Sequence, residues 1–118
     1  MKTGKYKKEI GKKAEDIAVK YLEQKGFKIL ERNYRKRFGE IDIICEKEGG
    51  IIFVEVRSLK SDFLRNPAES INFKKCEKIK KLAEEYIFSR NLNPEFVRFD
   101  VIAIFYPEKI YHYEDAFR

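Results

Sequence analysis

Charged side chains interrupt two short apolar stretches in the middle of the chain. The first stretch is residues 39–42 (GEID) and the second is residues 54–57 (VEVR). Charges in strands that are otherwise apolar are costly unless each one finds a partner. Two carboxylates a few Å apart repel unless a proton or cation lies between them, and carboxylate oxygens suit Mg²⁺ or Mn²⁺. Asp42 and Glu55 are therefore candidate metal ligands.

A β-hairpin is expected to carry both stretches. Residues 39–45 alternate charged and aliphatic side chains, and residues 51–56 are almost all β-branched or aromatic. Gly49 and Gly50 between them are typical of a two-residue turn, because both turn positions require positive φ. The pattern predicts two antiparallel strands joined at these glycines.

The register of this hairpin decides whether its charges meet. A turn centred on the two glycines would pair Asp42 with Arg57 and Ile44 with Glu55, all on one face. A one-residue change of register would move Asp42 to the other face. The ordinary alternative is a cross-strand salt bridge between Asp42 and Arg57, with Glu40 and Glu55 facing water.

Two helices and three further strands are expected around the hairpin. Apolar residues at helical spacing predict one helix from about Ile10 to Lys25, and a second that includes 76–87 and ends within 91–94. Strands are expected at residues 27–34, 96–106 and 110–113, in the order α-β-β-β-α-β-β. A helical crossover usually reaches a parallel strand, so the fold class is α/β with a mixed sheet flanked by helices. The 118 residues are expected to form a single domain, 1–118.

An acidic residue of the first helix could support the hairpin charges. Glu15 lies at the margin of the apolar stripe of that helix and could reach the sheet. Asp16 is expected to point to the solvent side.

Basic residues could bind phosphate near the same hairpin. The chain carries 26 Lys+Arg against 20 Asp+Glu, a net charge of +6 that favours polyanionic partners. Lys and Glu richness also accompanies adaptation to high temperature. Arg35 and Arg37 precede the acidic strand, while Lys74, Lys75 and Lys78 share one face of the second helix. These five are candidate contacts to backbone phosphates, although Lys-rich helix faces are also common without a ligand.

Other classes of protein are disfavoured by what the sequence lacks. No apolar run approaches the ~20 residues of a membrane span, and no secretory leader is visible, so we expect a cytoplasmic protein without a membrane partner. Cys45 and Cys76 lack the spacing of metal ligands and are expected to be buried, reduced thiols. The single His112 is expected to pack at a sheet edge, and the role of Asp100 stays open.

The order and spacing of several motifs resemble the bacterial YraN-like protein family. The resemblance spans nearly the whole chain, and the motifs are residues 11–22 with Ala14–Glu15, 32–35 (RNYR), 39–42 (GEID), 53–57 (FVEVR), 98–101 (RFDV) and 115–117 (DAF). That family is similar to archaeal Holliday-junction resolvases and belongs with the restriction-endonuclease-like, PD-(D/E)XK, nuclease superfamily.

The resemblance implies a Mg²⁺- or Mn²⁺-dependent phosphodiesterase. In it Asp42 and Glu55 hold the metal, the Val56 carbonyl can join them, and Glu15 supports the site. Arg57 stands where the superfamily has a lysine, although YraN-like proteins carry either residue. A guanidinium stays protonated, so it can orient phosphate but cannot act as a general base.

The implied activity is an endonuclease that acts on nucleic acid, with DNA favoured over RNA. Branched or damaged DNA in recombination or repair is the expected substrate, and the resemblance to resolvases suggests a two-fold homodimer. Two alternatives stay open. One is a nuclease-like fold that binds nucleic acid without cutting it, and the other is a protein-interaction adaptor.

Overall fold

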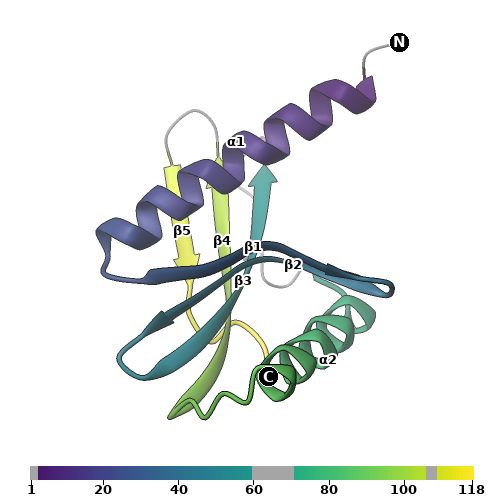
Figure 1. Cartoon of the computed structure of the whole chain (residues 1–118). Coiled ribbons are helices and arrows are strands. Elements are labelled where there is room, and N and C mark those ends of the chain that lie inside the picture. Colours follow the sequence, from purple (N-terminus) through teal and green to yellow (C-terminus); the bar gives the residue numbers. More distant parts are fainter. Residues whose placement is uncertain (1–2, 60–70, 106–108) are drawn as a thin grey trace.

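The computed structural model describes residues 3–59, 71–105 and 109–118, with side chains described from residue 12 onward (Figure 1). Within these residues, two helices and five strands follow one another in the predicted order. They are α1 (Thr3–Gln24), β1 (Lys28–Lys36), β2 (Gly39–Lys47), β3 (Gly50–Leu59), α2 (Phe73–Ser89), β4 (Phe96–Phe105) and β5 (Lys109–Tyr113). The predicted strand end at Tyr106 lies outside the described residues.

One mixed sheet forms the centre of the fold, with its strands in the order β1-β2-β3-β4-β5. β3 and β4 are parallel, and every other neighbouring pair is antiparallel. The α2 crossover connects the two parallel strands, as predicted. This arrangement confirms the mixed α/β fold.

The two helices cover opposite faces of the sheet (Figure 1). Ala14, Ala18 and Leu22 of α1 pack on one face, in a cluster that includes Cys45. The core on the α2 face contains Tyr34, Ile41, Ile44, Ile51, Phe53, Ile79, Leu82, Ala83 and Tyr86. β2 and β3 contribute to both clusters, so the acidic stretches lie in strands that are covered on both faces.

The two cysteines differ in burial. Both are free thiols, and Cys45 on β2 is fully buried, as predicted. Cys76 on α2 is only partly buried, which corrects the prediction for this residue. The buried positions of α2 begin further along the helix, at Ile79.

The start of α1 differs from the prediction, whereas its end agrees closely. The helix begins at Thr3, seven residues before the predicted start, because its Lys-rich first turns carry no apolar stripe that could reveal them. It ends before Gly26, which has a φ of 91°. The Phe27 amide donates to the Leu22 carbonyl at 3.0 Å, which is the capping pattern that a left-handed glycine permits.

The turn of the central hairpin is one residue earlier than predicted. Lys47 pairs with Gly50, so the turn residues are Glu48 and Gly49, both with positive φ. Gly50 belongs to β3 instead, where an added Cβ would lie 2.2 Å from the Phe96 ring. The close approach of Phe96 therefore explains this second glycine.

This shift corrects the predicted register of the hairpin. The residue numbers of each observed pair add up to 97, as in Ile43 with Val54 and Ile44 with Phe53, whereas those of the predicted pairs add up to 99. The predicted pairs of Asp42 with Arg57 and Ile44 with Glu55 are therefore wrong. Both sums are odd, so regular alternation would still place Asp42 and Glu55 on one face. The observed pairing ends at Ile43 with Val54, and Ile41 and Ile44 both pack in the α2-side core, so alternation is interrupted at Asp42.

None of the helices within the described residues has the length and apolar content that a membrane crossing requires.

Candidate functional site

Asp42 and Glu55 lie side by side on β2 and β3. The Val56 amide donates a hydrogen bond of 2.8 Å to Oδ2 of Asp42, which ties the first carboxyl group to the strand that carries the second. Asp42 and Glu55 both line the same pocket, and the negative charge of Glu55 helps to raise the pKa of Asp42. Only 5% of Glu55 is exposed, so the alternative in which it faces water is wrong. The predicted convergence of these two carboxylates is present.

Two cations from different elements neutralise Glu55. Nζ of Lys75, on the first turn of α2, lies 2.5 Å from Oε2 of Glu55. Nη1 of Arg57 lies 3.8 Å from the same oxygen. Asn72 caps α2 by accepting the Lys75 amide at 2.8 Å, which fixes the start of the helix beside the carboxylates. The helix lysine is therefore a closer partner of Glu55 than the strand arginine is.

The electrostatics of the pair favour a neutral Asp42 when no metal is bound. Burial raises the pKa of Asp42 to about 8, the neighbouring carboxylates of Glu55 and Glu15 act in the same direction, and the Val56 amide opposes them. A carboxyl group with such a pKa holds its proton at neutral pH. A divalent cation would replace that proton, because it favours the ionised form of both groups.

Glu15 lies on α1, where its charge contributes to raising the pKa of Asp42 and its ion-pair partner is Arg32. Burial raises the pKa of Glu15, whereas its hydrogen bond with Asn33 and its proximity to Arg32 lower it. Asn33 has a positive φ of 53° within β1, which is an uncommon conformation for a strand residue. The neighbouring Asp16 has a half-exposed side chain, in line with its predicted solvent side, and accepts a 2.7 Å hydrogen bond from Arg32.

A pocket of about 330 Å³ opens beside the carboxylates. Its lining joins the tip of the β1–β2 hairpin, the acidic strands and the start of α2. The lining residues are Phe38, Gly39, Glu40, Asp42, Glu55, Asn72, Lys74, Lys75, Lys78 and Ile79. All three predicted helix lysines therefore meet the two predicted metal ligands in one pocket.

The two predicted arginines lie outside this lining. Arg35 donates to Glu40 at 2.7 Å, so an acidic neighbour already balances its charge. Arg37 is exposed in the turn that follows β1. The structure thus brings the helix lysines to the carboxylates more directly than it brings these arginines.

The donor set of the pocket fits Mg²⁺ or Mn²⁺. Mg²⁺ is usually held by one or two carboxylates, with water and substrate phosphate completing its coordination. Asp42 and Glu55 supply two such carboxylates, and the raised pKa of Asp42 shows that a nearby positive charge would favour its ionised form. No group of three His, Cys, Asp or Glu side chains at metal-binding distances occurs among the described residues. A metal here would therefore depend on water and substrate for its remaining ligands.

Asp100 belongs to a separate, structural network on β4. The side chain is fully buried and accepts hydrogen bonds from the Arg98 guanidinium at 2.9 and 3.0 Å and from the Asp115 amide at 3.0 Å. His112 Nε2 lies 2.7 Å from Asp100, and the His112 ring packs against Tyr21. The prediction that His112 packs at a sheet edge agrees with this placement on β5.

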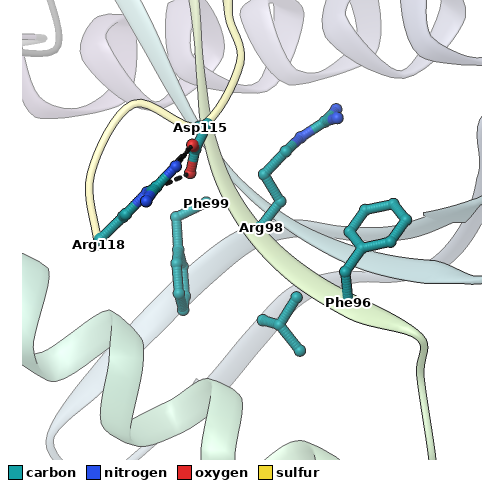
Figure 2. Close-up of a pocket in the computed structure, with 6 residues that line it drawn as sticks. Phe96, Arg98, Phe99, Asp115 and Arg118 are labelled. Atoms are coloured by element: carbon teal, nitrogen blue, oxygen red, sulfur yellow. Dashed lines mark hydrogen bonds and ion pairs between the residues drawn. The ribbon is translucent and has the colours of Figure 1, made fainter.

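A second hollow, of about 480 Å³, lies between the start of β4 and the C-terminal segment. Figure 2 shows Asp115 and Arg118 in its lining, paired with each other, together with Phe96, Arg98 and Phe99. Arg98 is held by Asp100 and Glu114. Each of these charges has a neutralising partner. This hollow is therefore a weaker candidate for binding a charged ligand than the carboxylate pocket is.

Two features of the carboxylate pocket were missed from the sequence. Phe38 was not singled out, and Lys75 was expected to contact phosphate rather than Glu55. The N-cap signal at Asn72 could have placed the first turn of α2, but the sheet register was also needed to bring that turn to Glu55.

Comparisons with known proteins identify close relatives of this chain. The model of "Uncharacterised protein family UPF0102" matches residues 14–104. A UPF0102 protein of Persephonella marina is 50% identical over 91% of this chain and 91% of its own length. A UPF0102 protein of Clostridioides difficile is 50% identical over 93% of this chain and 97% of its own. These matches confirm the resemblance at the level of the family.

A solved structure, Pyrococcus furiosus SfsA in complex with Ca²⁺, matches more weakly. The match covers 92% of this chain and 63% of the SfsA chain, at 19% identity and a TM-score of 0.34. At that score the likeness carries no argument about fold or activity.

Proposed function

The chain belongs to the uncharacterised protein family UPF0102, and from this premise and the carboxylate pocket we propose that it is a metal-dependent endonuclease acting on DNA. The observation that carries the proposal is the meeting of the carboxyl groups of Asp42 and Glu55 in one pocket lined by three lysines. This pairing of hard oxygen ligands with phosphate-binding cations suits phosphodiester cleavage. We further propose that the fold belongs to the restriction-endonuclease-like superfamily. We also propose that the protein acts in the cytoplasm.

The charged residues that carry this proposal have distinct roles. Asp42 and Glu55 hold Mg²⁺ or Mn²⁺, and Glu15 supports them from α1. When bound, the metal would polarise the scissile phosphate and lower the pKa of a coordinated water molecule. Lys74 and Lys78 orient the phosphate through charge-assisted hydrogen bonds.

The two cations nearest Glu55 have different parts. A guanidinium is a poor base, so Arg57 would stabilise charge that develops on the phosphate and would not remove a proton. Lys75 forms an ion pair with Glu55, and it would be available to phosphate if a metal neutralised that carboxylate.

The test is cleavage of labelled DNA by the purified protein in Mg²⁺ or Mn²⁺. Single-stranded, linear duplex and four-way-junction substrates would be compared. Glu55→Gln should lower the cleavage rate at least about a hundredfold, because the variant loses several kcal/mol of metal-dependent stabilisation. A chelator should abolish cleavage in the same way.

Glu46→Gln is the matched control for this experiment. Glu46 lies on β2 and pairs with Lys28 at the surface, at 3.7 Å. We expect its replacement to leave cleavage unchanged. Cleavage that persists in Glu55→Gln or in chelator would come from a contaminant and would overturn the proposal.

A second candidate function is nucleic-acid binding without cleavage. The contacts of Lys75 and Arg57 with Glu55 favour it, because they satisfy that carboxylate without a metal. Calorimetric titration with Mg²⁺ or Mn²⁺ separates the two candidates. Metal binding that Asp42→Asn and Glu55→Gln both abolish supports the nuclease, whereas DNA binding without metal binding supports the second candidate.

A further inference from the structure

Phe38 is an exposed aromatic residue at the rim of the carboxylate pocket. It lies in the turn between β1 and β2, lines the pocket and is 37% exposed. A single exposed ring is ordinary on a protein surface, so its exposure alone indicates no function. Its place in the same pocket lining as Asp42 and Glu55 points to a contact with the substrate.

The hairpin tip that carries Phe38 is held firmly against α2. A Cβ added at the adjacent Gly39 would lie 3.2 Å from the Leu82 side chain and 3.7 Å from Cβ of Lys78. Glycine thus allows the tip to approach the helix closely. Nζ of Lys81 lies 5.5 Å from the centre of the Phe38 ring, within the range of a cation–π contact. The Phe38 ring therefore lies against Lys81 and lines the same pocket as Lys74, Lys75 and Lys78.

An aromatic ring beside cations and carboxylates combines the groups that recognise one nucleotide. Lysines bind the phosphate of a single strand, and aromatic rings stack on its bases. We propose that Phe38 stacks on an unpaired base next to the scissile phosphate, so that the substrate is nucleic acid with single-stranded or extruded nucleotides. This inference rests on the proposed function and narrows its substrate class.

The requirement for an unpaired base follows from the chemistry of stacking. Inside a duplex the faces of each base are covered by neighbouring bases, so a protein ring can reach a face only after the base leaves the stack. The pocket volume of about 330 Å³ is near the lower end of small-molecule sites, which span roughly 300–1,000 Å³. A pocket of this size can hold a nucleotide, but it cannot enclose a duplex.

The test uses oligonucleotides that contain 2-aminopurine, whose fluorescence falls when the base stacks on an aromatic ring. Binding to single-stranded DNA and to the matching duplex is measured in chelator, so that metal-dependent cleavage does not proceed. For Phe38→Leu we expect a loss of quenching and a single-strand Kd raised by about fivefold to a hundredfold, the range for removing one stacking ring. Duplex binding should change little.

Two further variants serve as controls for this test. Phe38→Trp retains a stacking ring and should preserve both quenching and affinity. Phe88→Leu replaces an 86% exposed phenylalanine near the far end of α2 and should behave as the original protein. Thermal unfolding followed by circular dichroism checks that each variant is folded.

The possible results separate this inference from the proposed function. Unchanged single-strand binding in folded Phe38→Leu, or an equal loss on single strand and duplex, would overturn the stacking role, even if cleavage depends on Glu55. Loss of stacking in Phe38→Leu alone would support it. If stacking is present but no metal-dependent cleavage occurs on any substrate, the nuclease proposal fails while the base-binding site stands.

Discussion

Nζ of Lys75 lies 2.5 Å from Oε2 of Glu55, whereas the nearest Arg57 nitrogen lies 3.8 Å from that oxygen. The charge that balances the buried carboxylate therefore comes chiefly from α2 and not from the neighbouring position on β3. An ammonium group and a divalent cation satisfy the same need of Glu55, so the two compete for it. This competition couples the position of Lys75 to metal binding.

Replacing Lys75 with methionine should tighten metal binding. The variant keeps a long apolar side chain and removes the competing charge, so we expect the Kd for Mn²⁺ to fall by roughly tenfold, which corresponds to about 1.4 kcal/mol. Isothermal titration calorimetry measures this directly. Lys74→Met is the matched control, because Lys74 lines the same pocket and is exposed. An unchanged or weaker affinity in Lys75→Met would contradict the competition.

The stability of the metal-free protein should depend on pH through Asp42. Its pKa is about 8 in the folded protein and has an ordinary value of 3.8. Between these values the folded form holds a proton that the unfolded form has released, so the free energy of unfolding falls as pH rises from about 4 to about 8 and then levels off. Asp42→Asn removes this contribution and should flatten the profile.

Urea denaturation in chelator, at a series of pH values between about 5 and about 9, measures these slopes. Asp16→Asn is the control. Its partner Arg32 lowers the pKa of Asp16, so the stability from this pair is present above the ordinary pKa and is lost only as pH falls through the lowered one. The Asp16→Asn profile should therefore parallel the original over this range. Equal slopes for Asp42→Asn and the original protein would show that Asp42 titrates normally.

Binding of single-stranded DNA should depend on salt through Lys74 and Lys78. Each phosphate that a lysine neutralises on a single strand contributes roughly −0.7 to the slope of log affinity against log salt concentration. The double variant Lys74→Gln/Lys78→Gln should therefore have a shallower slope, by roughly 0.7 for each phosphate that is no longer neutralised. Fluorescence anisotropy at several salt concentrations gives the slope.

The control for the salt experiment is Lys20→Gln. Lys20 is an exposed residue of α1, the helix that packs on the opposite face of the sheet from α2. Its replacement should leave the slope unchanged. If both variants reduce the slope equally, the protein binds DNA through its overall charge rather than through the pocket.

Much of the fold could be predicted from sequence because its signals are local. Apolar periodicity marked both helices, β-branched runs marked the strands, and the crossover rule predicted the parallel pair of β3 and β4. The predicted position of the hairpin turn was wrong because the two adjacent glycines occur for different structural reasons. Gly49 needs positive φ, whereas Gly50 admits the Phe96 ring, and a contact with β4 leaves no local signal.

The site was predictable to the extent that it depends on strand alternation. Regular alternation would place Asp42 and Glu55 on one face in any register with an odd sum, so the error in the turn did not by itself separate them. The partner of Glu55 was not predictable in this way. Lys75 reaches Glu55 across 20 positions in the chain, through the placement of α2 on the sheet, and no residue pattern specifies that distance.

The last prediction separates the buried Asp100 from the carboxylate pocket. Asp100→Ala leaves Arg98 and His112 without their shared acceptor, so we expect the free energy of unfolding to fall by about 3–5 kcal/mol, as for other broken buried pairs. Urea denaturation measures the decrease. Glu46→Ala removes a surface pair and should cost less than about 1 kcal/mol.

Metal affinity gives the second readout for Asp100. At a temperature where Asp100→Ala is still folded, its Kd for Mn²⁺ should equal that of the original protein, because the Asp100 network is separate from Asp42 and Glu55. A variant of normal stability but weakened metal binding would instead place Asp100 in the metal site. In that case the network around His112 would be a support for the pocket, and the division between the structural and the functional carboxylates would be wrong.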